Sequence, residues 1–267
     1  MKPLHILPLL LLALCSCEKD LDFEYHDIEP LTVIEGTLNE DGAKVSISNT
    51  TPLDEPFGST RIKDATVSIS DLDSGESWQL LADAEGKFTA PVAPAVGHEY
   101  ELSVEKDGQR YSARSKMLRA TEILSLDWGW VDMLGQDVAA LQIVFKDTRL
   151  SDNEMYWIRV YKNGEDYNWS LLGKHLSLSD TLTEVVMTTR RDPEDDDAKT
   201  NLYAGDVLKV TVTPINEEMF DYLWALLYTG SYGRQMFSGD FCLGYFIASP
   251  VASAEIVYHP DEIERYK

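Results

Sequence analysis

Glu99-Tyr100-Glu101-Leu102-Ser103-Val104-Glu105 is a run in which polar and apolar residues alternate strictly. A period of two turns one side of the backbone toward an apolar interior and the other toward water, which is typical of a half-buried β-strand. Asp107-Gly108 comes shortly after the run and favours a tight hairpin, because Gly adopts a positive φ without strain. The stretch therefore predicts antiparallel β-structure.

The first block of the chain, residues 31–118, repeats this pattern around Val45, Ile47, Val67 and Ile69. Its turn pairs are Asp41-Gly42, Ser74-Gly75, Glu85-Gly86 and Asp107-Gly108. Short strands with turn signals about every ten residues favour a β-sandwich. A parallel α/β fold would need helical crossovers, and no such pattern stands between these strands. We predict an N-terminal β-sandwich here.

A second block, residues 121–214, is also predicted to be β. Asn163-Gly164 lies between two strand-like runs and is a strong hairpin signal. The apolar positions that alternate with polar or smaller neighbours include Leu141, Ile143, Phe145, Leu208, Val210 and Val212. We interpret this block as an immunoglobulin- or fibronectin-like sandwich, so the fold class is mostly β with two tandem sandwiches.

Residues 215–267 are predicted to form a helix followed by a segment rich in Gly and aromatic residues. Asn216 is a suitable N-cap, and Glu217 and Glu218 stand in the first turn, where the helix dipole favours anions. An apolar stripe at helical spacing follows, formed by Phe220, Leu223, Trp224 and Leu227. One stripe indicates that the helix lies against a sandwich.

The N-terminal segment, residues 1–16, has the layout of a secretory signal peptide: Lys2, a short apolar run and the small residue Ser16. The run is too short to span a bilayer, which needs about 20 residues. The Leu14-Cys15-Ser16-Cys17 stretch resembles a bacterial lipobox with Cys17 as the lipidated residue. Cys15 is the weaker candidate, because bulky Leu14 would then occupy the cleavage position; an ordinary signal peptide is the other alternative.

Residues 17–30 are expected to be a flexible tether. Glu18, Asp20, Asp22 and Glu24 place acidic charge beside the predicted lipid, where a phospholipid-seeking segment would be basic. This acidic patch resembles the export signal of Bacteroidetes surface lipoproteins, which implies an outer-membrane protein that faces the cell exterior. A plain solvated tether is compatible with the same residues.

The net charge of −23 describes an acidic protein, and removal of residues 1–16, with one Lys and no acid, makes it −24. Such a body repels phosphate backbones, so nucleic acid is a poor partner. Only Cys17 and Cys242 remain after processing. If Cys17 carries lipid, no intramolecular disulfide can form, and the sandwiches depend on their apolar cores.

Several stretches together resemble one known family. In the first block these are Val33-Ile34-Glu35-Gly36, Ser48-Asn49-Thr50, Glu85-Gly86-Lys87-Phe88 and Gly97-His98-Glu99-Tyr100; the block also resembles transthyretin-like and carboxypeptidase-regulatory-like modules. Later stretches are Asp152-Asn153-Glu154-Met155-Tyr156 and Leu243-Gly244-Tyr245-Phe246, with Glu154, Met155 and Leu243 departing from the pattern. The chain thereby resembles the Bacteroidetes surface lipoprotein family called domain of unknown function 4249.

This resemblance implies a lipoprotein associated with a TonB-dependent outer-membrane transporter. The chain would then be a non-catalytic binding accessory in nutrient uptake, held to the membrane by Cys17. The alternative is a structural or adhesive envelope protein in which the sandwiches are spacers. Ligand capture requires a concave aromatic and polar site, whereas a spacer would be convex and featureless.

Catalytic patterns are missing from the sequence, so we expect neither an enzyme nor a cofactor. Single, scattered His residues and the lack of paired Cys argue against zinc, and there is no Gly-x-Ser-x-Gly elbow. The densest acidic run is a weak calcium candidate, because carboxylate oxygens suit that ion. It lacks the spacing of a calcium loop, and a solvated loop is the ordinary alternative. Its acidic residues are Asp192, Glu194, Asp195, Asp196 and Asp197.

Trp128 and Trp130 stand two apart in a strand-like run, so both are expected on one face. Such a pair can stack on a sugar or an aromatic group, although core packing is the commoner role of Trp. Asp180-Thr181-Leu182 resembles the acceptor of Bacteroidetes O-glycosylation, which makes Thr181 a modification candidate. A motif of three residues also occurs by chance.

Overall fold

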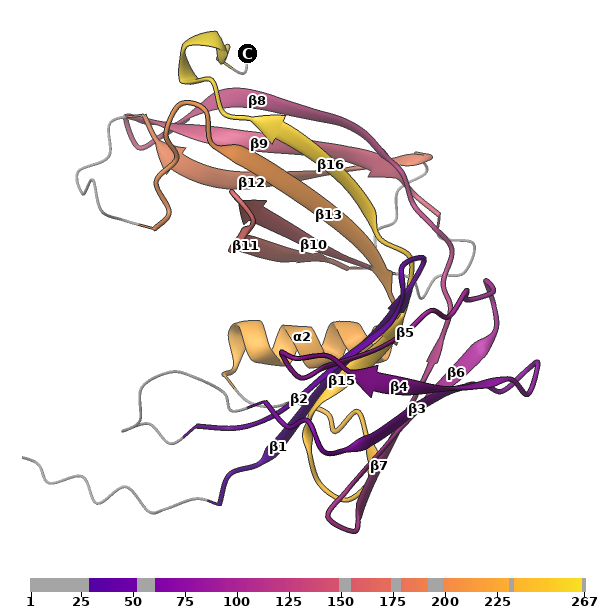
Figure 1. Cartoon of the computed structure of the whole chain (residues 1–267). Helices are drawn as coiled ribbons and strands as arrows, with labels where there is room; N and C mark the ends of the chain where they lie inside the picture. Colours follow the sequence, from indigo (N-terminus) through magenta and orange to yellow (C-terminus); the bar gives the residue numbers. More distant parts are fainter. Residues whose placement is uncertain are drawn as a thin grey trace, which may run out of the picture.

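The computed structural model describes residues 29–51, 61–148, 155–173, 179–191, 199–230 and 233–265. It confirms the predicted fold class: the protein is mostly β, with sandwich-like sheets and a short helix toward its C-terminal end. Figure 1 shows two lobes that meet along one side. We call them the first sandwich (β1–β7, β14 and β15) and the second sandwich (β8–β13 and β16).

The first sandwich is a nine-stranded sheet that folds over on itself, with the strand order β14-β7-β6-β3-β4-β5-β2-β1-β15. Its strands are β1 (Thr32–Asn39), β2 (Gly42–Asn49), β3 (Thr66–Asp71), β4 (Ser77–Ala82), β5 (Lys87–Ala90), β6 (Glu99–Lys106), β7 (Gln109–Lys116), β14 (Ser238–Gly239) and β15 (Leu243–Ala248). One core takes side chains from both halves of the sheet, including Ile34, Phe88 and Leu102. Near the two edges, the Ala248 N–H donates to Ser115 Oγ at 2.9 Å.

The stretch of residues 99–105 lies in strand β6, and its buried and exposed positions alternate as predicted. Tyr100, Leu102 and Val104 are buried in the first core, while Glu99 and Ser103 are exposed. Asp107 and Gly108 both have positive φ, 50° and 82°, and join β6 to β7 in register. The hairpin prediction is therefore confirmed at this turn.

The second sandwich places a three-stranded sheet, β12-β9-β8, over a four-stranded sheet, β11-β10-β13-β16. Its strands are β8 (Ile123–Met133), β9 (Gln136–Lys146), β10 (Met155–Lys162), β11 (Glu165–Leu172), β12 (Thr181–Arg190), β13 (Val207–Ile215) and β16 (Ala252–Val257). Between the sheets lies a core that includes Leu141, Phe145, Ile158 and Val210. The predicted Asn163-Gly164 hairpin joins β10 to β11, with φ of 51° and 89°.

The C-terminal part of the chain is shared between the two lobes. After β13, the chain forms helix α2 (Glu217–Tyr228) and then returns to the first sandwich as β14 and β15. Strand β15 pairs in parallel with β1, so that Glu35 lies opposite Tyr245. The chain then crosses back as β16, which pairs with β13 and precedes the short 3-10 helix η2 (Pro260–Glu262). Residues 215–267, predicted as a segment after both sandwiches, thus complete both of them.

Helix α2 begins as predicted, because Asn216 Oδ1 accepts the Met219 N–H at 2.9 Å. Its buried face differs from the prediction. The stripe that packs inward is Met219, Tyr222 and Leu223, whereas Trp224 and Leu227 are 45% and 39% exposed. The prediction was wrong for Trp224 and Leu227 because helical spacing identifies an apolar arc without saying which part of it meets a neighbour.

No helix in the described ranges is long and apolar enough to cross a membrane. The predicted signal peptide, Cys17 and most of the tether fall within residues 1–28, which lie outside the described residues.

Candidate functional site

The structure places both Trp128 and Trp130 in the second sandwich, on β8. Trp130 is 3% exposed and belongs to the core. Trp128 packs against that core, makes an edge contact with Tyr258 at 5.2 Å between ring centroids, and donates from Nε1 to the Val257 carbonyl at 3.2 Å. The pair therefore forms no open stacking surface, and the ligand-stacking prediction was wrong because interior packing uses the same alternation.

The other predicted residues have separate outcomes. Thr181 is exposed at the start of β12, where its Oγ1 lies 3.0 Å from Ser179 Oγ, so its modification stays a prediction. The calcium candidates Asp192 and Glu194 to Asp197 lie outside the described residues. Cys242 is a free cysteine buried in the first core, and burial raises the pKa of its thiol to about 12. That thiol is protonated at neutral pH and is a poor nucleophile.

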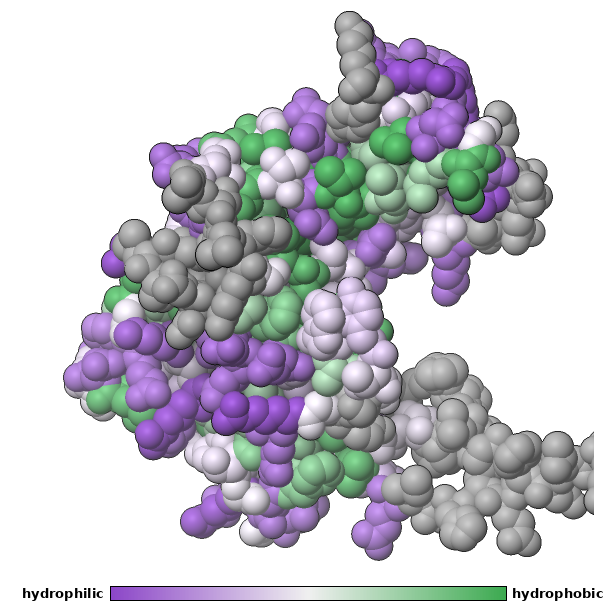
Figure 2. All heavy atoms as spheres, turned by 180° about the vertical axis from the view of Figure 1, so that it is seen from behind, coloured by the Kyte–Doolittle hydropathy of each residue, from purple (hydrophilic) through white to green (hydrophobic). Residues whose placement is uncertain are grey.

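A hollow lies between the two sandwiches, open on one side (Figure 2). In Figure 1, strands β10 and β11 of the second sandwich stand on one side of it, and α2 crosses its base. Strands β1 and β15 belong to the first sandwich below. A third apolar cluster joins the lobes behind the hollow and includes Trp157, Ile215, Leu223 and Ile247.

One face of the four-stranded sheet brings polar residues to this junction. Trp157 and Arg159 on β10 pair across the strands with Thr213 and Thr211 on β13, so all four point to the same side. Five buried side-chain polar atoms lack a hydrogen-bond partner among the described residues, and four are Trp157 Nε1, Arg159 Nε, Thr211 Oγ1 and Thr213 Oγ1. Because most buried polar groups are paired, such a concentration marks this face as a functional candidate.

Arg159 is held by aromatic rings instead of by a carboxylate. Its Cζ lies 4.3 Å from the centre of the Trp157 ring and 5.5 Å from that of Tyr161. These three residues occupy alternate positions of β10, so the two rings flank the guanidinium and restrict its motion. Arg159 makes no ion pair with a carboxylate in the described part of the chain.

The opposite side of the hollow carries Glu35 on β1 and Tyr245 on β15. Glu35 is open to solvent, yet the surrounding protein raises the pKa of its carboxyl, and the charges of Arg159 and Arg61 only partly oppose this. Burial likewise raises the pKa of Tyr245, and Glu35 adds to that rise. A side chain that solvent reaches but protein crowds is expected on a concave wall.

Helix α2, which crosses the base of the hollow in Figure 1, carries a row of aromatic rings. Phe220 stacks on Trp224 at 5.6 Å between ring centroids, and Trp224 meets Tyr228 at 4.1 Å. Spacing of four residues places them on one helix face. Trp224 and Tyr228 are 45% and 63% exposed, so this row presents ring surface to solvent. The elements around the hollow thus carry exposed aromatic surface, the guanidinium of Arg159 and the carboxylate of Glu35.

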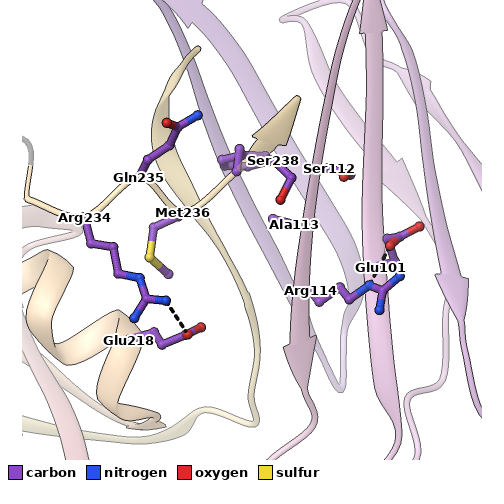
Figure 3. A pocket seen from close by; sticks show the side chains of 10 residues that line it. Glu101, Ser112, Ala113, Arg114, Glu218, Arg234, Gln235, Met236 and Ser238 are labelled. Atoms are coloured by element: carbon purple, nitrogen blue, oxygen red, sulfur yellow. Dashed lines mark hydrogen bonds and ion pairs between the residues drawn. The ribbon is translucent and has the colours of Figure 1, made fainter. Parts of the chain in front are cut away.

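A second concavity, a pocket of about 500 Å³, lies between the start of α2 and strands β6, β7 and β14. Figure 3 shows its charged residues paired within the wall. Arg114 Nε lies 2.7 Å from Glu101, and Arg234 Nη2 lies 3.2 Å from Glu218. Its size suits a small ligand. However, the pairs neutralise the two arginines, so this pocket is a weaker candidate than the hollow.

Asp71, Asp73 and His98 form the described cluster nearest to a metal site, with ligand atoms within 4.8 Å of one another. These groups already have partners. Asp71 accepts from the Asp73 and Ser74 N–H groups and lies 2.8 Å from His98 Nδ1, while Asp73 accepts the Glu99 N–H. The cluster therefore ties the turn after β3 to the start of β6, and its role is structural.

Sequence reasoning missed the residues of the hollow, although two signals were present. The run Tyr156-Trp157-Ile158-Arg159-Val160-Tyr161 has aromatic or aliphatic groups on both faces. That composition indicates a strand covered on both sides, one side by a neighbour outside its own sandwich. Exposed aromatic residues on α2 were the other signal, hidden because they were assigned to the packed stripe.

Comparisons with known proteins add little. No protein-family model matches the chain, and no curated protein matches it. A solved structure titled "Cytokine receptor complex - Crystal form 1A" is 10% identical, with 85% of this chain and 95% of that chain covered, at a TM-score of 0.25. A similarity that weak carries no argument about fold or function.

Proposed function

We propose that this protein is a lipid-anchored, surface-exposed binding accessory of a TonB-dependent outer-membrane nutrient transporter, without catalytic activity of its own. The observation that carries the proposal is the hollow between the sandwiches, with the guanidinium of Arg159, which pairs with no carboxylate among the described residues, the carboxylate of Glu35 and the aromatic row of α2. A concave site with aromatic surface and a few placed polar groups is the usual form of a binding site.

The alternative, an adhesive or structural spacer, has less support. A spacer has no use for polar atoms buried without partners, since each costs about 1–3 kcal/mol of stability. Cys242 gives no support to catalysis either, because its thiol is buried and protonated. The anchor rests on the Cys17 lipobox, and the acidic tether supports export to the surface.

Affinity purification tests the transporter partner. A tag after Lys267 is used to recover the protein from gently solubilised outer membranes. We expect a large β-barrel transporter in near-stoichiometric amount. The matched control is a chimera in which residues 1–30 carry an unrelated soluble domain; it shares the anchor and lacks the sandwiches. Equal recovery with the chimera, or repeated absence of a transporter, would contradict the proposal.

Two further experiments test the lipid anchor and the location on the cell surface. Cys17→Ala should release the protein into soluble fractions, whereas Cys15→Ala should leave it bound; reversed results would show that Cys15 is the acceptor. Protease added to intact cells should degrade the sandwiches. If they are protected until the outer membrane is broken, the protein faces the periplasm.

A further inference from the structure

The hollow holds two opposite charges that do not pair with each other. Arg159 belongs to the second sandwich and Glu35 to the first, and the guanidinium is near enough to lower the pKa of the carboxyl. No ion pair joins them. Charges of opposite sign gain most by direct contact, and these two lie on different sandwiches without forming an ion pair, so a ligand with charges of both signs would satisfy both.

Arg159 is presented in a form that suits an oxyanion. Its guanidinium lies over Trp157 and Tyr161, and its Nε is buried without a hydrogen-bond partner among the described residues. The terminal guanidinium nitrogens of Arg159 are therefore the ones that can reach a ligand. A guanidinium whose motion is already restricted binds a carboxylate in a bidentate manner with little further loss of entropy.

Glu35 supplies the complementary half. Its crowded carboxylate gains from a cation or a strong hydrogen-bond donor, and an ammonium group provides both. The protein's strongly negative charge repels a ligand that is a net anion. A ligand of zero net charge, with carboxylate and ammonium close together, satisfies both walls without this penalty.

Aromatic rings lie beside both charges. Tyr245 is the neighbour of Glu35 across the β1–β15 pair, and its ring centroid lies 6.0 Å from that of Trp157. Trp169, opposite Arg159 on β11, makes another edge contact with Trp157 at 6.3 Å. Trp157 is buried between them, whereas Tyr245 and Trp169 are half-buried and leave part of their ring surface for an apolar side chain.

We propose that the hollow binds zwitterionic, peptide-like ligands, with the carboxylate on Arg159, the ammonium on Glu35 and an apolar side chain against the aromatic rings. This assignment rests on the proposed binding function and names its ligand class.

Calorimetric titration of the detergent-solubilised full-length protein tests this class. The probes are alanyl-phenylalanine, its N-acetylated form, its C-amidated form and the neutral sugar maltotriose. We expect the free dipeptide to bind, and each capped form to bind about tenfold or more weakly, because each cap removes one charge-assisted contact. Maltotriose should show no binding at the same concentrations.

Variants then assign each contact. In Glu35→Gln the N-acetyl penalty should disappear while the C-amide penalty remains, and Arg159→Gln should show the reverse. Arg110→Gln and Glu76→Gln remove exposed charges on the first sandwich, away from the hollow, and should bind the free dipeptide like the unchanged protein. Melting temperatures confirm that all four variants fold.

Three results would overturn the assignment: equal affinity for free and capped dipeptides, penalties that stay unchanged in both hollow variants, or no dipeptide binding. Binding of maltotriose in place of the dipeptide would refute the zwitterionic ligand class but would still agree with a binding function. Co-purification of a transporter is measured separately, so the proposed function stands or fails on its own result.

Discussion

Gly244→Ala is expected to destabilise the protein strongly, because β1 leaves no room for a side chain at this position of β15. Gly244 has φ of +106°, and a Cβ placed there would lie 1.9 Å from the Ile34 carbonyl oxygen and 2.7 Å from its carbon. The strained φ costs about 1–3 kcal/mol for a residue with a side chain. The contacted atoms are backbone, so the two strands must also separate, which weakens ladder hydrogen bonds worth about 1 kcal/mol each.

The expected total loss for Gly244→Ala is about 3–5 kcal/mol, a large part of the 5–15 kcal/mol typical of a folded protein. Gly205→Ala is the matched control, because Gly205 has a similar φ of +95° and no atom within 4 Å of the added Cβ. It should lose only the φ penalty, about 1–3 kcal/mol.

Urea unfolding followed by Trp fluorescence measures both free energies. We expect Gly244→Ala to unfold at clearly lower urea than Gly205→Ala. Losses equal within about 1 kcal/mol, the usual error of such comparisons, would refute the parallel pairing of β15 with β1.

Three other predictions follow from the packing. Trp130→Ala should cost about 3–5 kcal/mol of unfolding free energy because its ring fills a core, whereas Trp224→Ala should cost about 1 kcal/mol or less; urea unfolding distinguishes them, and similar losses would contradict the assigned positions. A chain of residues 29–118 should fail to show the circular dichroism of a folded β-protein, because it lacks β14 and β15; a cooperative thermal transition would disprove this. The Asp71–His98 pair should stabilise the fold most between about pH 4 and 6.5. Burial alone would raise the pKa of Asp71, but hydrogen bonds from His98 and backbone N–H groups hold it well below its usual range, so this contribution is lost as pH falls. The hydrogen bond to Asp71 raises the pKa of His98, so the stabilisation by the pair is lost as pH rises through the pKa of His98 in the folded protein. The melting temperature of the unchanged protein should therefore fall on the alkaline side, and this fall should be missing in His98→Gln. An unchanged profile of melting temperature against pH in that variant would argue against the pair.

Strands β14 to β16 were not predicted, but local patterns were enough to predict β-structure in residues 31–118 and 121–214, two hairpins and the cap of α2. Each depends on residues within a few positions of one another, such as Asp107-Gly108 or Asn216 with Met219. The pairing of β15 with β1 joins Val33 to Leu243, and no local rule connects residues so distant. Its one signal was the nearly continuous apolar run from Leu243 to Ala248, which is typical of a buried parallel strand.

The hollow was beyond sequence reasoning for the same physical reason. Glu35 lies on a strand whose alternation predicts its outward face, and Arg159 lies on a strand that is apolar on both faces, yet neither pattern says that the two residues meet across the junction. Trp128 and Trp130 show the opposite error: two Trp residues at alternate positions of a strand were predicted as a binding surface, and they pack in the core of the second sandwich. The sequence shows the chemistry of each residue, but it does not show which distant residues lie next to each other in the fold.

The path of the chain makes the hollow a preformed site. Segments after β7, β13 and β15 all pass between the lobes, so moving one lobe against the other strains three connections at once. At the crossing, Ser249 Oγ donates to the Pro214 carbonyl at 2.6 Å in a buried position, and the cluster around Trp157 and Leu223 packs beside it. Opening this junction would expose that cluster and break the bond. These contacts hold the strands that carry Arg159 and Glu35 in place, so the proposed site is formed in the protein without a ligand. A preformed site of this kind avoids the ordering cost of closure, so its affinity depends on how well a ligand spans the two charges.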